Sequence, residues 1–198
     1  MTLRRSVAVL LLVALACAAV AEAKSIRGTN RADKLSGTTA NDRIDGRGGN
    51  DQLFGLRGDD RRLGGAGRDR LSGQSGRDTL RGGADKDKLV GGVDDDVLNG
   101  DADGDSLNGG AGDDVLTDTV GNNSFAGGPG DDSMTGGAGN DRLDGGLGED
   151  ELNGGDGNDT IRARDREQDT INCGPGEDTV VVDAEEDGVF DCENVQFP

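Results

Sequence analysis

The chain has 198 residues, of which 37 are glycine, and its 40 acidic residues outnumber 21 basic ones to give a formal net charge of −19. Glycine at about 19% is far above the usage near 7% of ordinary proteins, so an average globular composition is excluded. The sequence contains no His, which excludes His-based zinc sites and catalytic systems that need a His base. The negative charge argues against nucleic acid as a partner, whereas many short Asp carboxylates suit a hard cation.

The N-terminal segment has the features of a secretory signal peptide. Two arginines at 4–5 precede the apolar run Val7–Val20, and Ala21–Ala23 offers small residues for cleavage after Ala23. The apolar run is shorter than the roughly 20 residues that span a bilayer. A lipid anchor on Cys17 is a poorer alternative, because the residues before it fit a bacterial lipobox badly. We therefore expect residues 1–23 to be removed and the mature protein to be secreted and extracellular, without a membrane span.

A nine-residue repeat begins at Gly28 and continues for fifteen blocks without an insertion or deletion. Position 1 is Gly in all blocks but the one that starts at Asp118, and position 6 is Asp in all but the one with Asn123. Position 8 is apolar in all but the block with Arg62. A disordered Gly/Asp linker would show no such phase, so the pattern predicts a repeat domain over residues 24–162.

The blocks resemble the calcium-binding nonapeptide G-G-x-G-x-D-x-U-x of the RTX, or haemolysin-type, family. This resemblance implies an all-β fold, a right-handed parallel β-roll (a β-solenoid) with two repeats per coil. Six residues of each block would form a turn and three a short strand, and several Ca²⁺ ions would lie between stacked turns. The implied metal ligands, besides turn carbonyls, are the position-6 side chains and their two counterparts in degenerate copies: Asp33, Asp42, Asp51, Asp60, Asp69, Asp78, Asp87, Asp96, Asp105, Asp114, Asn123, Asp132, Asp141, Asp150, Asp159, Asp178 and Asp187.

The residue types within a block support the same picture. Ca²⁺ takes 6 to 8 oxygens at about 2.3 to 2.6 Å, so backbone carbonyls must turn inward sharply, and glycine at positions 1, 2 and 4 permits this through positive φ. Position 7 is mostly polar and position 8 apolar, which is the period of a strand. Fifteen turns give thirteen pairs of neighbouring turns on the same side, and from these pairs we expect roughly 8 to 12 bound ions. The predicted core column is Leu35, Ile44, Leu53, Leu71, Leu80, Leu89, Leu98, Leu107, Leu116, Phe125, Met134, Leu143, Leu152 and Ile161.

Departures from the consensus carry further expectations. Arg62 at an inward position suggests a local bulge or a side chain that snorkels to solvent, in preference to a charged core. Basic residues at position 5 fit either a solvated outer face or weakened ion sites, and they are Arg68, Arg77 and Lys86. Three blocks have Asp in place of Gly at position 4, which would add ligands: Asp85, Asp94 and Asp103.

The phase slips after residue 162, and we expect residues 163–198 to form degenerate repeats and a C-terminal cap. Of the three cysteines, only Cys173 and Cys192 remain after removal of the signal peptide. In an oxidising compartment an even pair favours a disulfide, so these two cysteines are predicted to be bonded. Such a cap would cover the apolar edge of the last coil.

The function that follows is that of a secreted calcium-binding repeat protein that folds on binding several Ca²⁺ ions. An enzyme is not expected, because H-E-x-x-H is impossible without His and no G-x-S-x-G elbow is present. The alternatives are a cell-surface or matrix adhesin or structural spacer, with an unknown surface or polysaccharide partner, and, less favoured, a fragment of an RTX-type enzyme.

Overall fold

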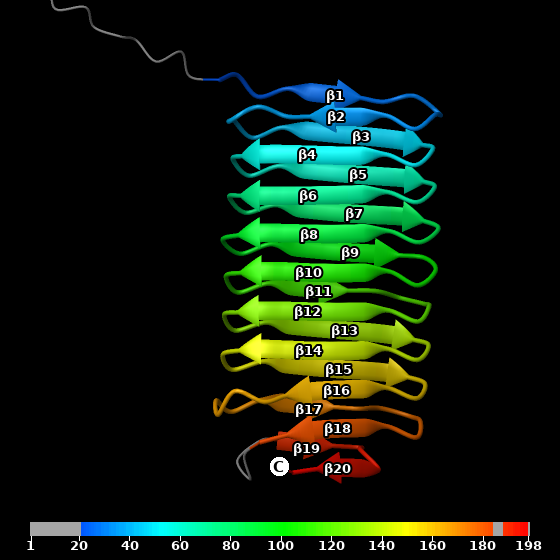
Figure 1. The fold of residues 1–198 in the computed structure, drawn as a ribbon, viewed down its shortest axis with the longest axis vertical. Helices are drawn as coiled ribbons and strands as arrows, with labels where there is room; N and C mark the ends of the chain where they lie inside the picture. Colours follow the sequence, from blue (N-terminus) through cyan, green and yellow to red (C-terminus); the bar gives the residue numbers. More distant parts are fainter. Residues whose placement is uncertain (1–20, 184–187, 198) are drawn as a thin grey trace, which may run out of the picture.

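The structure, a computed structural model, describes residues 21–183 and 188–197. These residues contain twenty strands and no helix, arranged as two parallel ten-stranded sheets that face each other along the whole molecule (Figure 1). Consecutive strands lie in opposite sheets, so two blocks complete one coil. The predicted all-β parallel β-roll is therefore confirmed. The predicted signal peptide up to residue 20 and the predicted ligand Asp187 lie outside the described residues.

The odd-numbered strands form one sheet and the even-numbered strands the other. The odd sheet consists of β1 (Ser25–Arg27), β3 (Arg43–Gly48), β5 (Arg61–Ala66), β7 (Thr79–Ala84), β9 (Val97–Asp101), β11 (Val115–Thr117), β13 (Ser133–Ala138), β15 (Glu151–Asp156), β17 (Thr170–Asn172) and β19 (Gly188–Phe190). The even sheet consists of β2 (Lys34–Ser36), β4 (Gln52–Arg57), β6 (Arg70–Ser75), β8 (Lys88–Val93), β10 (Ser106–Ala111), β12 (Ser124–Pro129), β14 (Arg142–Leu147), β16 (Thr160–Ala163), β18 (Thr179–Val182) and β20 (Asn194–Gln196).

Position 8 of each block forms the core between the two sheets, as predicted. Residues from Ile44 to Ile161 in this column are buried, whereas Leu35, near the end of the roll, is only partly buried. In-register pairing places each of these side chains on the one 18 residues later, as in Leu89 and Leu107. The apolar ladder therefore runs along the axis of the roll.

The strands are longer than the predicted three residues. Most have six, and β3 shows why: it covers positions 7 to 9 of one block and positions 1 to 3 of the next. The residue at position 1 is buried like the one at position 8, so the period-2 alternation continues across the block boundary. The turn is correspondingly shorter than six residues.

Glycine has two different roles, and the predicted role of position 1 was wrong. Positions 2 and 4 take positive φ, as in Gly65 (φ 112°) and Gly67 (φ 108°). Gly64 at position 1 does not, but a Cβ there would lie only 2.6 Å from Gly82 O of the next same-side turn. Glycine at position 1 is therefore required by close packing.

The predicted bulge or snorkelling at Arg62 was also wrong. Strand β5 is regular there, because Arg62 pairs in register with Ile44 on one side and Leu80 on the other. The Arg62 side chain is buried, with 2% of the residue exposed. The core is thus charged at this level, since Arg62 forms ion pairs with Asp60 and Asp78.

The C-terminal segment continues the roll. Strands β17 to β20 add to both sheets, and the spacing between same-side positions lengthens from 18 to 19 residues where the phase slips. Cys173, which directly follows β17, forms a disulfide with Cys192, with the two Cα atoms 5.2 Å apart. The disulfide therefore joins one coil to the next.

Candidate metal centre

Two ladders of position-6 side chains follow the turns on the two sides of the roll. In each ladder the backbone N–H of one position-6 residue donates to Oδ1 of the next, at 2.6–2.9 Å. We call the space between two such neighbouring turns a turn gap. One stack contains Asp33, Asp51, Asp69, Asp87, Asp105, Asn123, Asp141, Asp159 and Asp178, and the other contains Asp42, Asp60, Asp78, Asp96, Asp114, Asp132, Asp150 and Asp169.

The second carboxylate oxygen, Oδ2, lacks such a partner in most turns. It is buried and has no hydrogen-bond partner among the described residues in Asp51, Asp69, Asp78, Asp87, Asp96, Asp105, Asp114, Asp132, Asp141, Asp159 and Asp178. A buried polar atom normally has a hydrogen-bond partner, and the free-energy cost of lacking one is larger for a charged group. A repeated set of unpartnered carboxylate oxygens therefore indicates a cation.

Backbone carbonyls converge on the same places. A Cβ added to Gly136 would touch Asp141 Oδ2 and would lie 2.5 Å from Gly154 O of the next same-side turn. Strand pairing also skips position 1, because Asp45 pairs with Leu63 and then Arg47 with Gly65. Carboxylate and carbonyl oxygens therefore meet where position 1 has no side chain.

This donor set fits a hard cation. No three His, Cys, Asp or Glu side chains gather at one point in the part of the chain that the structure describes, so side chains alone could not complete a coordination sphere. Ca²⁺ accepts backbone carbonyls together with a few carboxylates, whereas structural zinc sites use Cys and His. The residues present in the turn gaps therefore fit Ca²⁺.

The pKa values of the gap carboxylates are shifted in the direction that a buried anion requires. The pKa of Asp87 is raised to about 8, chiefly by burial and in addition by the neighbouring carboxylates of Asp105 and Asp69. Burial likewise raises the pKa to about 7 in Asp96, Asp105, Asp132 and Asp150. It raises the pKa to about 6 in Asp69, Asp78, Asp114 and Asp141. Ionised carboxylates in these positions need a counter-charge.

Comparison with known families agrees with this geometry. The RTX calcium-binding nonapeptide repeat (four copies) matches the chain in overlapping segments, residues 27–61, 63–98, 90–124, 99–134, 117–152 and 126–161. The chain belongs to the RTX calcium-binding repeat family. No curated protein is similar to it over its sequence. The family name implies calcium, which is the cation that the turn gaps fit.

The first two RTX blocks differ from the others in their turn gaps. Asp33 Oδ2 accepts bonds from Thr29 N at 2.6 Å and Thr29 Oγ1 at 2.8 Å, and these bonds lower the Asp33 pKa. Asp42 Oδ2 accepts bonds from Thr38 N and from Thr38 Oγ1, the latter at 3.0 Å. Both predicted ligands therefore already have protein partners at this oxygen.

The RTX block that starts at Asp118 lacks a carboxylate in one turn gap and adds one to another. Its position-6 residue, Asn123, donates Nδ2 to Gly136 O at 3.3 Å, so an amide group occupies that gap. Its position-1 residue, Asp118, is buried and directs Oδ2 to the Cβ position of Gly100, where Asp105 Oδ2 also lies. One gap loses a carboxylate and another gains one.

Three residues that were not predicted as ligands lie in a turn gap or extend the ladders. Asp118 lies in a turn gap, and its signal in the sequence was the break in the glycine column. Asp169 accepts the Asp150 N–H at 2.9 Å, one residue later than the period requires. Glu193 Oε2 accepts the Asp178 N–H at 2.9 Å and continues the Asp33 stack. Asp169 follows the slip to a spacing of 19 residues, whereas Glu193 lies only 15 residues after Asp178.

The remaining departures from the consensus lie outside the gaps. At position 4, Asp85, Asp94 and Asp103 take positive φ, and their side chains are exposed. They are therefore not placed as ligands. Asp94 instead accepts the Gly76 N–H at 3.1 Å. The basic residues at position 5 are exposed, which agrees with a solvated outer face: Arg68, Arg77 and Lys86.

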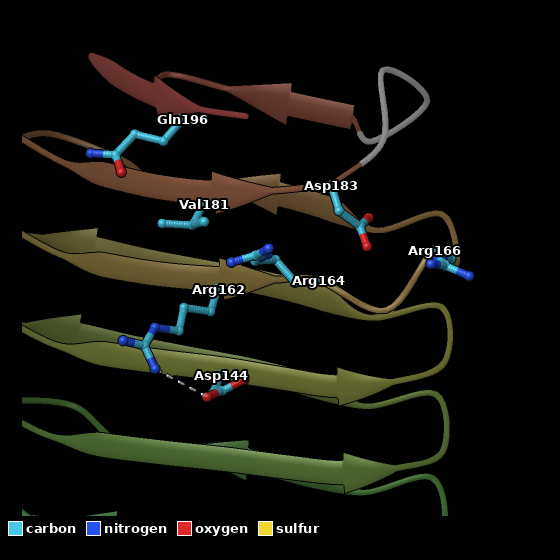
Figure 2. A pocket seen from close by; sticks show the side chains of 7 residues that line it. All are labelled: Asp144, Arg162, Arg164, Arg166, Val181, Asp183 and Gln196. Carbon is cyan, nitrogen blue, oxygen red and sulfur yellow. Dashed lines mark ion pairs between the residues drawn. The ribbon is translucent and has the colours of Figure 1, made fainter. Parts of the chain in front are cut away.

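A surface groove lies on the outer face of the even sheet near its C-terminal end (Figure 2). Its lining residues are Asp144, Arg162, Arg164, Arg166, Val181, Asp183 and Gln196, and Arg162 Nη1 lies 3.9 Å from Asp144 Oδ2. None of these side chains is a nucleophilic hydroxyl or thiol. The described part of the RTX protein also contains no helix long and apolar enough to cross a membrane.

Proposed function

We propose that this RTX protein is a secreted calcium-binding protein whose β-roll folds as Ca²⁺ ions enter the turn gaps. The observation that carries the proposal is the series of buried Oδ2 atoms without a partner among the described residues. Most of these atoms lie close to a position-1 carbonyl oxygen of the next same-side turn, as Asp141 Oδ2 does, and Asp105 Oδ2 lies close to Asp118 Oδ2, so one ion can share the oxygens of two turns.

When bound, Ca²⁺ would neutralise the carboxylates and cross-link neighbouring turns. The chain's own residues supply the rest: position-6 side chains order the turns through their Oδ1 bonds, and positions 1, 2 and 4 bring the carbonyls close. Eleven position-6 aspartates have an unpartnered buried Oδ2, which supports a capacity of about ten ions. Asp187 remains a predicted ligand outside the described residues.

Secretion is part of the proposal. Its support is the charged, then apolar, then small-residue order of positions 4 to 23, together with the Cys173–Cys192 disulfide. A binding or structural role without catalysis is proposed on the ground that the repeats and their C-terminal continuation account for the whole described chain.

A calcium titration followed by circular dichroism tests the proposal. At pH 8 we expect the chelator-treated protein to lose most of its β-sheet signal and to regain it on addition of Ca²⁺, with about ten ions bound per chain by native mass spectrometry. Mg²⁺ at the same ionic strength is the control, because it screens charge equally but requires octahedral geometry and shorter distances. A β-sheet signal that chelator leaves unchanged would contradict calcium-dependent folding.

A further inference from the structure

One turn gap contains a positive charge that the chain itself provides. Arg62 occupies position 8, which is apolar in the other fourteen blocks, and its side chain turns from the core into the gap between the turns of Asp60 and Asp78. Both carboxylates and the guanidinium are fully buried as side chains. A buried ion pair of this kind persists only where its geometry is specific.

A single nitrogen of Arg62 contacts all the oxygen types that a gap offers. Nη2 donates to Asp60 Oδ2 at 2.9 Å, to Asp78 Oδ1 at 3.0 Å and to Gly73 O at 3.2 Å. It also lies where a Cβ on Gly55, the position-1 glycine of the same block, would be placed. The ligand set of a turn gap, two carboxylates from neighbouring turns and one position-1 carbonyl, is therefore gathered around a guanidinium nitrogen.

The neighbouring gaps provide the comparison. Asp51, Asp69 and Asp78 each keep a buried Oδ2 without a partner among the described residues, whereas Asp60 Oδ2 is bonded to Arg62. The gap before it in the same stack is also satisfied internally, because Thr38 bonds to Asp42 Oδ2. Asp42 Oδ2 and Asp60 Oδ2 therefore both have protein partners, and Arg62 joins the turns of Asp60 and Asp78.

We propose that the Arg62 guanidinium takes the place of one Ca²⁺ ion, so that this gap binds no metal and holds its two turns together without calcium. The inference rests on the proposed function, since it identifies which gap of the series is closed to the ion. An ion at 2.3–2.6 Å from the same oxygens would occupy the space of Nη2, so the two exclude each other.

The presence of Arg62 at position 8 has an energetic cost, and this cost sharpens the test. Arg62 Nε and Nη1 are buried without a hydrogen-bond partner among the described residues, so these two nitrogens lose their hydration without gaining a protein hydrogen bond. Leucine, the usual residue at position 8, removes that cost and opens the gap. Arg62→Leu should therefore gain stability in saturating Ca²⁺ and lose it in chelator.

Ion counting by native mass spectrometry at saturating Ca²⁺ tests the inference. We expect Arg62→Leu to bind one more Ca²⁺ ion than the wild-type protein, and Arg62→Met to do the same if the Leu variant folds poorly. Arg61→Leu is the matched control, because it removes the same charge from an exposed position one residue away and should leave the count unchanged. An equal count in the position-62 variants and the wild type would overturn the inference.

Hydrogen exchange in chelator separates this inference from the proposed function. The amides of Arg61 and Thr79 donate to Asp42 O and Asp60 O, both at 2.8 Å, and lie across the two gaps. We expect them to exchange more slowly in the wild type and in Arg61→Leu than in Arg62→Leu. Equal exchange would refute the metal-free role of Arg62, whereas a wild type that binds no Ca²⁺ at all would refute the proposed function and leave this comparison valid.

Discussion

At the scale of single residues, each position-6 carboxylate has two oxygens in different surroundings. Oδ1 accepts a backbone N–H from the preceding same-side turn, and Oδ2 faces the following turn, as in Asp141. The Arg62 contacts show one nitrogen reached by Oδ2 of one turn and Oδ1 of the next. One aspartate therefore contributes to two gaps, and its loss should affect both.

Asp141→Asn should raise the Ca²⁺ concentration for half-folding clearly more than Asp33→Asn. Asp141 Oδ2 is buried and unpartnered within the described chain, and the gap between Asp141 and the preceding same-side turn already contains the neutral amide of Asn123. Asp33 lies at the end of its stack, and Thr29 already bonds to its Oδ2. The two changes remove the same charge, so simple relief of repulsion would shift both midpoints equally. Circular dichroism during a Ca²⁺ titration measures the difference, and equal shifts would refute ligation in register.

The sequence predicted which column supplies the carboxylates but not which gaps depart from the rule. Asp33 and Asp60 are in the right phase, yet their Oδ2 atoms accept hydrogen bonds from Thr29 and Arg62. The contact of Arg62 with Asp78 joins residues 16 positions apart, and it exists only after two coils have stacked. A repeat pattern read one block at a time contains no information on such contacts.

At the scale of strands, the position-1 glycine connects the packing of the sheet to the metal gap. The predicted three-residue strand followed from counting the turn as six residues, but β13 covers Ser133–Ala138, with Gly136 buried inside it. Strand length could not be predicted because glycine gives no hydrophobic signal at an inward position. Only the closeness of the next coil explains why position 1 is Gly in every block but the one that starts at Asp118.

Gly136→Ala should destabilise the calcium-loaded roll by about 1–3 kcal/mol, the usual cost of overpacking. The added Cβ would touch Asp141 Oδ2 and lie 2.5 Å from Gly154 O, so the gap could not keep both oxygens in place. Gly48→Ala is the matched control, because a Cβ there meets no atom closer than 3.7 Å and φ is not positive. Thermal unfolding in saturating Ca²⁺ compares them. A stable Gly136→Ala variant that binds the full number of ions would show that this cradle does not hold metal.

At the scale of the whole molecule, charge is unevenly distributed along the roll. Residues 24–90 contain 15 Lys and Arg against 10 Asp and Glu, and residues 91–198 contain 4 against 29. Chain order is also the order along the axis (Figure 1). The N-terminal end of the roll is therefore basic and the rest is strongly acidic. The internal contacts of Thr29, Thr38 and Arg62 lie at the basic end. Under the proposed function, the acidic part therefore depends most on calcium.

Without metal, the roll should become less stable as pH rises from about 4 to 8. Burial raises the pKa of Asp87 to about 8 and that of Asp132 to about 7, from the ordinary 3.8. The unfolded chain loses these protons near pH 4, whereas the folded roll keeps them to higher pH, so the folded state binds more protons and the free energy of unfolding falls as pH rises. In chelator we expect a stronger β-sheet signal at pH 5 than at pH 8.

The same pH comparison in Ca²⁺ is the control. Calcium binds the deprotonated carboxylate, so the calcium midpoint should fall as pH rises and the order of the two signals should reverse. A metal-free protein that gains stability between pH 5 and pH 8 would show that these carboxylates are not buried as protonated groups.

Because the strands stack in parallel, the number of coils sets the length of the roll along its axis. Ten strands in each sheet, at about 4.8 Å from one to the next, place the first and last strands about 43 Å apart. With the Cys173–Cys192 disulfide intact, the same stretch from Ser25 to Gln196 can reach about 510 Å when fully extended. Under the proposed function, a rise in calcium shortens the chain more than tenfold relative to that limit. A tether built from this domain would therefore pull its two ends together as calcium rises, which makes an ion concentration readable as a distance or a force.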